Sequence, residues 1–457
     1  MERNTVILRD TDVFMRGELD NVTISDGRIV LDLVQGGYVP YGCYTSAPLP
    51  MPAFDALRVS WNADAPDQTA VEMQARVMVD GNWSAWVTFG KWSRFLRRES
   101  PAPLDRGCLL QRPDVLQLDS KTGQQAQLRI YLYTKTERAT PAVSLLCASV
   151  RTQDGIPAGG RPVNTRLHLL PYAAARRAPA LRPWMDLACS LTALTNRWGA
   201  DLLPEELAQV LRDWRADSTD PRNLCFAAAA AAAWGFPAWV CYGNLALLRE
   251  EARHGFGAVV ALQATPAELA AGCPERRFAA VRGFTAVGSN PQVLLCDPCA
   301  AETDFATETA MPLDSFMVAW DNVALLMRPR PNGSGFMPRT RTGAWVRPAG
   351  TEFPDVYRLF VNGEEHPLRE DFCTGGGLLA WTEADGTVHA STAHRSFHFT
   401  EPVQGGLCIP KQETPRKCTV YAIDPAGQML VGDVTVYGQK CGRFYSLTVC
   451  ILLRFAV

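Results

Sequence analysis

Cys189 is the residue of this chain whose type and position could support nucleophilic chemistry. It lies within residues 182–199, where apolar side chains recur at the spacing of one helix face: Leu187, Leu191, Leu194 and Trp198. A thiol in the first turns of a helix feels the positive end of the helix dipole, which lowers its pKa and favours the reactive thiolate. The alternative is that Cys189 is a small buried apolar side chain, as a free cysteine commonly is.

The segments around this helix are typical of a mixed α+β domain. Gly199 marks the end of the helix, Pro204 opens a second one, and the alanine-rich run at 223–233 predicts a third. Because these helices come first and most strands gather behind them, the order favours an α+β arrangement over a doubly wound one. The apolar runs downstream predict a further helix at 245–253 and strands at 238–241, 258–262, 278–284, 293–296 and 323–327.

The flanking regions have the patterns of all-β structure. At 71–79 and again at 126–132, apolar and polar residues alternate with the period of a half-buried strand, and Asp80-Gly81 marks a hairpin turn. Segments 151–166 and 329–343 are rich in glycine and proline and predict linkers. We therefore expect a multidomain chain: an all-β sandwich at 1–150, an α+β domain at 167–328 and a C-terminal all-β domain at 344–457.

The composition narrows the classes of function. The chain has 457 residues and a formal net charge of −2, and the absence of a basic patch argues against nucleic-acid binding. We expect no membrane span, because no apolar run is long enough to cross a bilayer. Without a visible signal peptide we expect a cytoplasmic protein with reduced cysteines, or a secreted one if a leader has been removed. The oligomeric state does not follow from the sequence.

Two further groups of residues have both a structural and a functional interpretation. His389, His394 and His398, and the single Cys-x-x-Cys at 296–299, lack the spacing or the second pair that zinc requires, so we expect no metal and no cofactor. A dense set of tryptophans could fill the core and edges of the first domain, or could form a stacking platform for a glycan or cell-surface ligand: Trp61, Trp83, Trp86 and Trp92.

Several segments of the middle domain resemble the bacteriocin-processing (double-glycine-leader) papain-like cysteine peptidases. Residues 188–192 and 197–199 resemble the family's nucleophile helix, although Leu191 replaces a proline. Residues 223–238 resemble its asparagine-containing helix and the strand that follows. The motifs Val-Arg-Gly-Phe-Thr and Asn-Asp-Pro of the family are matched at 281–285 and 296–298.

The first domain also resembles the sandwich that precedes the peptidase-like domain in bacterial relatives, through residues 60–63 and 83–86. The resemblance therefore covers residues 1–330. It implies a papain-like fold, with Cys189 at the position of the nucleophile and Asp297 at the position that orients the base.

Two functional positions depart from the family pattern. In its register, Arg277 occupies the place of the base histidine, and a guanidinium stays protonated and cannot accept a proton. The glutamine that donates to the oxyanion is also missing, because the matching segment at 170–174 contains none. His254 is a candidate substitute base, although in the family this segment is a turn away from the cleft.

The sequence thus favours a bacterial, catalytically degenerate peptidase fold that binds a peptide or protein segment in its cleft or scaffolds its β domains. The first alternative is an active cysteine peptidase with Cys189 as nucleophile and a non-standard base. The second is a glycan-binding or cell-surface protein that uses its β domains. We also expect Arg277 and Asp297 to form an ion pair beneath Cys189.

Overall fold

The computed structural model describes residues 4–152, 160–177, 181–198, 200, 202–215, 222–270, 275–286 and 290–329, and only backbone strands beyond residue 329. The chain divides into two compact units. Unit 1 comprises Met1–Leu167, Val210–Asp297 and Glu308–Gly333, and unit 2 comprises His168–Gln209, Pro298–Thr307 and Ser334–Val457. The three-domain division at the linkers remains a prediction.

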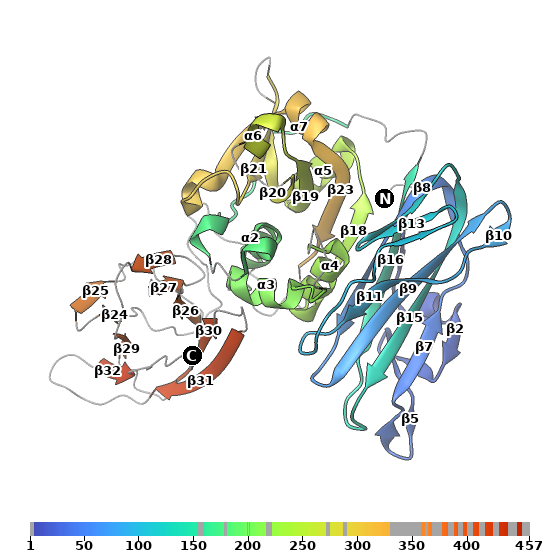
Figure 1. Ribbon diagram of the computed structural model, residues 1–457, viewed down its shortest axis with the longest axis horizontal. Coiled ribbons are helices and arrows are strands. Elements are labelled where there is room, and N and C mark those ends of the chain that lie inside the picture. The colour runs from blue at the N-terminus through green and yellow to red at the C-terminus, as the bar shows by residue number, and fades with distance from the viewer. Residues whose placement is uncertain are drawn as a thin grey trace. The chain divides into compact units, whose positions relative to one another are not determined.

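Residues 4–152, the N-terminal β region, form a fourteen-stranded antiparallel sheet (Figure 1). Its longest strands are β8 (Leu49–Asp64), β9 (Thr69–Val79), β15 (Gly123–Thr134) and β16 (Ala142–Thr152). The shorter ones are β1 (Thr5–Leu8), β2 (Glu18–Asp20), β3 (Val22–Ser25), β4 (Arg28–Leu31), β7 (Tyr41–Thr45), β10 (Asn82–Trp83), β11 (Val87–Trp92), β12 (Leu104–Arg106), β13 (Leu109–Arg112) and β14 (Val115–Leu118). Helix α1 (Thr11–Phe14) and the β5–β6 hairpin (Leu33–Val34 and Gly37–Tyr38) complete the region.

Strand β9 buries one face and leaves the other partly exposed, as its alternating sequence predicts. Its apolar residues Val71, Met73, Ala75 and Val77 are buried, and the polar residues between them lie on the opposite, partly exposed face. Asp80 and Gly81 both have positive φ and connect β9 to β10, so the predicted hairpin is confirmed.

The rest of unit 1 is a seven-stranded antiparallel sheet with short helices (Figure 1). Six of its strands follow the order β18-β23-β19-β20-β21-β22, and β17 pairs with β20. The strands are β17 (Thr165–Arg166), β18 (Ala238–Tyr242), β19 (Ala258–Gln263), β20 (Arg276–Thr285), β21 (Gln292–Cys296), β22 (Glu308–Pro312) and β23 (Trp320–Met327). The helices are α4 (Leu224–Ala233), α5 (Leu245–Arg253), α6 (Pro266–Ala270) and α7 (Leu313–Ala319). The predicted strands and the helix at 245–253 are confirmed.

Strand β18 is an edge strand whose free side is paired with side chains instead of another strand. Asn62 Nδ2 donates to the Ala238 carbonyl (2.6 Å), and Asn62 Oδ1 accepts from the Ala238 amide (3.0 Å). Further along β18, Ser60 Oγ accepts from the Val240 amide (3.0 Å) and Ser149 Oγ from the Tyr242 amide (2.9 Å). All three side chains are buried and belong to the N-terminal β region. They satisfy an edge that would otherwise expose backbone donors and acceptors.

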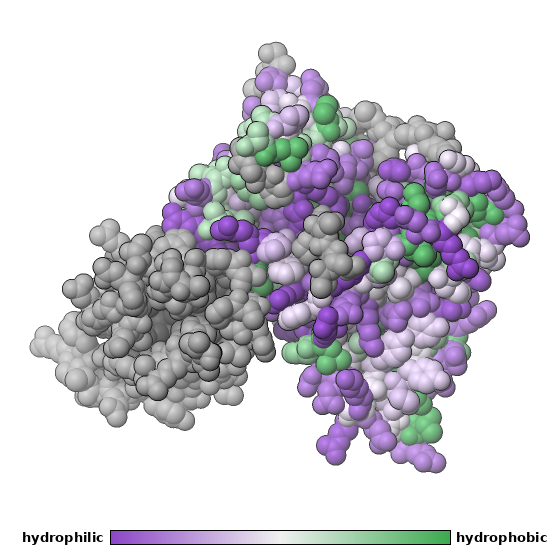
Figure 2. All heavy atoms as spheres, viewed as in Figure 1, coloured by the Kyte–Doolittle hydropathy of each residue, from purple (hydrophilic) through white to green (hydrophobic). Residues whose placement is uncertain are grey.

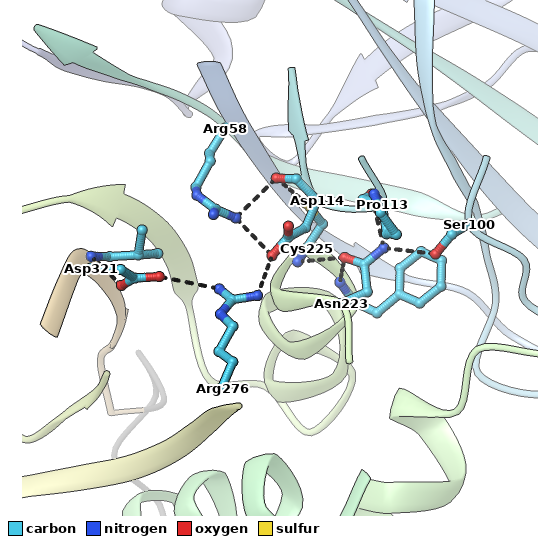
Figure 3. Close-up of polar contacts among 10 residues, drawn as sticks. Arg58, Ser100, Pro113, Asp114, Asn223, Cys225, Arg276 and Asp321 are labelled. Carbon is cyan, nitrogen blue, oxygen red and sulfur yellow. Dashed lines mark hydrogen bonds and ion pairs between the residues drawn. The ribbon is translucent and has the colours of Figure 1, made fainter. Parts of the chain in front are cut away.

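An ionic cluster, the Arg276 cluster, also joins the N-terminal β region to the seven-stranded sheet; its members Arg58 and Asp114 are buried, and Arg276 and Asp321 are partly exposed. Figure 3 shows Arg58 and Arg276 reaching Asp114 from two sides. Arg58 Nη1 lies 2.7 Å from Asp114 Oδ2, and Arg276 lies 3.8 Å from the same oxygen and 3.5 Å from Asp321 Oδ2. Beside it, the N-cap residue Asn223 accepts from two amides of α4 and donates to Ser100 Oγ.

The helices predicted around Cys189 are present in the described residues. Helix α2 spans Arg182–Arg197 and is buried along nearly its whole length, with Trp198 as its C-cap residue. Helix α3 (Pro204–Leu211) opens on the predicted proline. Asn196 Nδ2 donates to Tyr172 Oη (2.7 Å) and to the Leu202 carbonyl, which ties α2 to the segments before and after it. The 3₁₀ turns η1 (Ala174–Arg176) and η3 (Asp304–Thr307) complete this part.

The C-terminal part is β structure as far as it is described. Strands β25-β24-β29-β32 form one sheet and β28-β27-β26-β30-β31 another. His389 of β27 lies opposite His398 of β28, and His394 lies outside the described residues. The bounds are β24 (Arg358–Val361), β25 (Glu364–Pro367), β26 (Gly377–Thr382), β27 (Val388–Ser391), β28 (Ser396–Phe399), β29 (Gly405–Pro410), β30 (Arg416–Ile423), β31 (Met429–Val436) and β32 (Ser446–Val449).

The chain is thus β-rich and built from several sheets, as predicted. Among the described helices, none has the length and apolar character that a bilayer crossing requires. Figure 2 shows hydrophobic residues of the described surface in small separate groups among hydrophilic ones. Within the described residues, no group of three or more His, Cys, Asp or Glu side chains is placed so that it could hold a metal ion.

Candidate functional site

The predicted site residues are divided between the two units. Cys189 belongs to unit 2, whereas Arg277, Asp297 and His254 belong to unit 1. The predicted position of the Arg277–Asp297 pair beneath Cys189 therefore stays a prediction. The surroundings of each residue are nevertheless defined within its own unit.

Cys189 lies in the second turn of α2 and is 1% exposed. Burial raises the pKa of its thiol well above the ordinary value, and the positive charge of Arg177 only partly opposes this effect. The carboxylates of Glu205 and Asp304 raise the pKa further. The helix-dipole argument from the sequence was therefore wrong in direction, because desolvation of a buried thiolate outweighs the favourable dipole. The side chain has the properties of a protonated, buried thiol.

Arg177 is the charged neighbour of Cys189 that sequence reasoning missed. Its guanidinium is fully buried, lies 3.6 Å from Asp304 Oδ2 and 4.0 Å from Glu205 Oε2, and stacks 4.9 Å from the centre of the Tyr172 ring. Burial alone lowers the pKa of Arg177, but the two carboxylates outweigh it, so the pKa is raised and the guanidinium stays charged. No histidine is among the charged groups that act most strongly on Cys189. The sequence carried no signal for this contact, because Arg177 precedes the helix in an irregular segment.

Arg277 and Asp297 form the ion pair predicted from the sequence. Arg277 Nε donates to Asp297 Oδ2 at 2.9 Å, and the side chains are only 3% and 5% exposed. Burial alone lowers the pKa of Arg277, but the charges and hydrogen bonds of Asp297 and Glu268 outweigh it and raise the pKa. The guanidinium is therefore permanently charged and has no lone pair with which to accept a proton.

Glu268 is the second carboxylate on Arg277 and was not predicted. Its Oε1 lies 2.7 Å from Arg277 Nη2, and its Oε2 accepts from the Thr265 amide at 2.7 Å. Thr265 Oγ1 in turn accepts from the Glu268 amide, so the two residues form a capping box at the start of α6. The sequence Thr265-Pro266-Ala267-Glu268 is the signal that could have located this carboxylate at a helix N-terminus.

His254, the candidate substitute base, lies on the surface of unit 1. It is the C-cap residue of α5, its side chain is 60% exposed, and Nδ1 lies 3.5 Å from Glu250 Oε1 one turn earlier. This position is typical of a solvated helix end that interacts with its own helix.

The row of exposed tryptophans that would have supported glycan stacking is not present. Trp61 and Trp92 are fully buried, whereas Trp83 and Trp86 are partly exposed. Arg76 lies 4.7 Å from the ring centres of both Trp83 and Trp86, and Arg129 lies 3.9 Å from that of Trp86. The partly exposed rings are therefore already stacked against arginines.

Comparisons with known proteins support the predicted relationship to cysteine peptidases in the N-terminal part of the chain. Residues 9–150 match the family described as Peptidase C39 N-terminal domain, which supports a relationship to C39-like peptidases and a peptidase-like protein. No curated protein matches the sequence. A solved structure of a family two carbohydrate esterase from Cellvibrio japonicus is 14% identical, with a TM-score of 0.16, and covers 38% of this chain. The match spans 40% of the esterase, and a likeness this low carries no argument.

Proposed function

We propose that this chain is a non-catalytic peptidase-like protein, a papain-like fold that binds a peptide or protein segment or scaffolds its β regions. One observation carries the proposal. The residue in the register of the base histidine, Arg277, is fixed between two carboxylates as a buried and permanently charged guanidinium. Cysteine peptidases need a base that can take and return a proton, and a guanidinium can do neither.

The state of Cys189 supports the same proposal. The thiolate is the nucleophile in cysteine chemistry, and it forms only where the surroundings stabilise its charge. Burial raises the pKa of Cys189, and Glu205 and Asp304 bring negative charge close to it. At neutral pH the side chain is therefore a thiol. With Cys189 protonated and Arg277 at the position of the base histidine, the proposal leaves the chain without a nucleophile and without a base.

The first experiment tests turnover directly. The full chain is incubated with a pool of unstructured peptides, and the products are followed by mass spectrometry. Cys189→Ala removes the proposed nucleophile position, and Cys225→Ala is a matched control because Cys225 is likewise fully buried in the first turns of a helix. We expect no cleavage above background in any of the three proteins. Cleavage that disappears in Cys189→Ala and persists in Cys225→Ala would replace the proposal with an active cysteine peptidase.

The second experiment measures the thiol itself. Alkylation of Cys189 by iodoacetamide is followed by peptide mapping as the pH is raised, in the folded and in the urea-unfolded chain. Because burial raises the pKa and restricts access, we expect the folded rate at neutral pH to be at least about tenfold below the unfolded rate. A folded rate above the unfolded one, with a midpoint below about 8.5, would show an activated thiolate and contradict the proposal.

A further inference from the structure

The outward face of the N-terminal β region has a set of interleaved cations and aromatic rings, named here the arginine–aromatic face. It lies on β9, β10, β11 and β15 and on the β10–β11 connection, on the side opposite the buried residues of β9. All its members are partly or fully exposed. They are Arg76, Trp83, Trp86, Lys91, Arg129 and Tyr133.

The cations of this face are stacked on rings rather than paired with carboxylates. Arg76 lies against Trp83 and Trp86, Arg129 against Trp86, and Lys91 Nζ lies 4.3 Å from the centre of the Tyr133 ring. Such contacts hold a charged group in place while leaving its edge accessible. Two guanidinium groups therefore share one indole as a preorganised pair.

Within the described residues, none of these three cations has a carboxylate oxygen within ion-pair distance. Arg76 donates through Nε to Gln127 Oε1 (2.8 Å), and Arg129 donates to Thr45 Oγ1 and to the Tyr131 hydroxyl. Elsewhere in unit 1, Arg58, Arg151 and Arg277 all have acidic partners. The arginine–aromatic face thus has three cations and, on the strands that form it, one carboxylate, Glu72, which pairs with none of them.

The one carboxylate among the strands of this face, Glu72, keeps its charge and is held by three uncharged donors. Glu72 Oε1 accepts from Gln74 Nε2 and Thr88 Oγ1, and Oε2 accepts from the Tyr133 hydroxyl. Among the described residues, the Arg76 side chain has a hydrogen-bond acceptor only at Nε, and the residue is partly exposed. A surface of fixed donors and positive charge is complementary to a ligand that carries several carboxylates.

We propose that the arginine–aromatic face is a docking surface for an acidic peptide segment of a partner protein. Strands β9 and β15 each have a strand on both sides, so the segment binds through side chains and not by adding a strand. A glycan would stack on open ring faces, and here arginines already cover the rings of Trp83 and Trp86. Aspartate and glutamate side chains instead reach the outer edges of Arg76 and Arg129.

The test uses the full chain and a fluorescein-labelled peptide of repeated Glu-Ser pairs, with the Gln-Ser peptide as the uncharged probe. Fluorescence anisotropy at low salt measures binding. We expect the Glu-Ser peptide to bind and the Gln-Ser peptide not to bind. The double variant Arg76→Gln with Arg129→Gln is expected to weaken binding by at least about tenfold, because two charge-assisted contacts are lost. Raising the salt should weaken the wild-type complex.

The control is Arg112→Gln, the same substitution at an exposed arginine that is paired with Asp105. It should bind the Glu-Ser peptide within about twofold of wild type, because a rim charge outside the face contributes little. If the double variant loses its fold by circular dichroism, Lys91→Gln takes its place, since Lys91 is exposed and makes no ion pair.

Three results would overturn the proposal: no binding of the Glu-Ser peptide, equal binding of both peptides, or an equal loss in Arg112→Gln. Binding of dextran sulfate without binding of the Glu-Ser peptide would overturn the choice of a peptide partner. None of these results depends on whether Cys189 is catalytic.

Discussion

Arg276 and Arg277 are neighbours in one strand, yet they belong to two separate ionic clusters. Because successive side chains of a strand point to opposite faces, Arg276 meets Asp114 and Asp321, and Arg277 meets Asp297 and Glu268. The Arg277 cluster is local, since its partners are nine and twenty residues away in the chain. The Arg276 cluster joins four segments that are far apart in the sequence, around residues 58, 114, 276 and 321. One strand therefore carries both the predicted site and the attachment of the N-terminal β region.

The comparison shows that the loss of an ion-pair partner should cost more stability where the remaining charge is buried than where it can be hydrated. Arg58 and Asp114 are both nearly completely buried, so neither charge can return to water when its partner is lost. Glu268 of the Arg277 cluster is 33% exposed and can be solvated again. We therefore expect the Arg276 cluster to matter more for stability, and the Arg277 cluster to matter more for the chemistry of the site.

The largest expected effect follows from Arg58→Met. This change leaves Asp114 buried with only the more distant Arg276 as a counter-charge, and should lower the free energy of unfolding by about 3–5 kcal/mol. Urea denaturation of the full chain measures the change. The control is Arg151→Met, which breaks a half-exposed pair with Asp55 and should cost about 1 kcal/mol or less. Equal losses in the two variants would contradict the special role of the Arg276 cluster.

A smaller effect is expected from Arg277→Met. Asp297 stays buried after the change, but Glu268 is rehydrated, so the loss should be about 2–3 kcal/mol by the same denaturation measurement. Glu268→Gln keeps the acceptor for the Thr265 amide and removes one charge, and should cost less than Arg277→Met. A loss in Arg277→Met as large as that in Arg58→Met would remove the difference between the two clusters.

The smallest effect is a pH dependence within the Arg276 cluster. Burial alone would raise the pKa of Asp114, but Arg58 and Arg276 outweigh it, so the folded-state pKa is lowered. The ionised Asp114 therefore stabilises the fold above its unfolded pKa of about 4, and this contribution is lost as the pH falls through the folded pKa. The difference in unfolding free energy between wild type and Asp114→Asn should shrink on acidification.

Asp321 provides a matched test, because its pKa is shifted in the opposite direction from that of Asp114. Burial raises its pKa in the folded state despite the attraction of Arg276 and Arg58. Its ionised form therefore destabilises the fold at neutral pH, and acidification relieves that cost. Wild type should gain stability relative to Asp321→Asn as the pH falls. Parallel trends in the two variants, measured by denaturation across the acid range, would show that the two carboxyls do not differ as described.

Much of the fold could be predicted because the decisive patterns are local. The alternation in β9, the apolar spacing of α2 and the N-cap asparagine of α4 each specify an element from within a few residues. The Arg277–Asp297 pair could also be predicted, because in the family register Arg277 and Asp297 stand at the positions of the base and of the residue that orients it. In the fold Arg277 lies on β20 and Asp297 directly follows β21. Both strands, β20 and β21, lie side by side in the sheet.

The rest depends on contacts that no local pattern encodes. The fully buried Arg177 and the raised pKa of Cys189 depend on how deeply α2 is enclosed, which helical periodicity does not reveal. The sequence shows only that Arg276 and Arg277 point to opposite faces of their strand. It does not show the partners of Arg276, which lie far away at positions 114 and 321. Ser60 and Asn62 resembled the companion sandwich, but their hydrogen bonds to β18 are visible only in the folded chain.

The polar side chains along the free side of β18 have a consequence for dissecting the protein. A fragment that starts after the first glycine-rich segment would keep β18 but lose Asn62, Ser60 and Ser149, and its exposed backbone would be a template for intermolecular pairing. Such a fragment should precipitate or form β-rich aggregates when expressed alone. The N-terminal β region thus covers an edge that the seven-stranded sheet would otherwise expose.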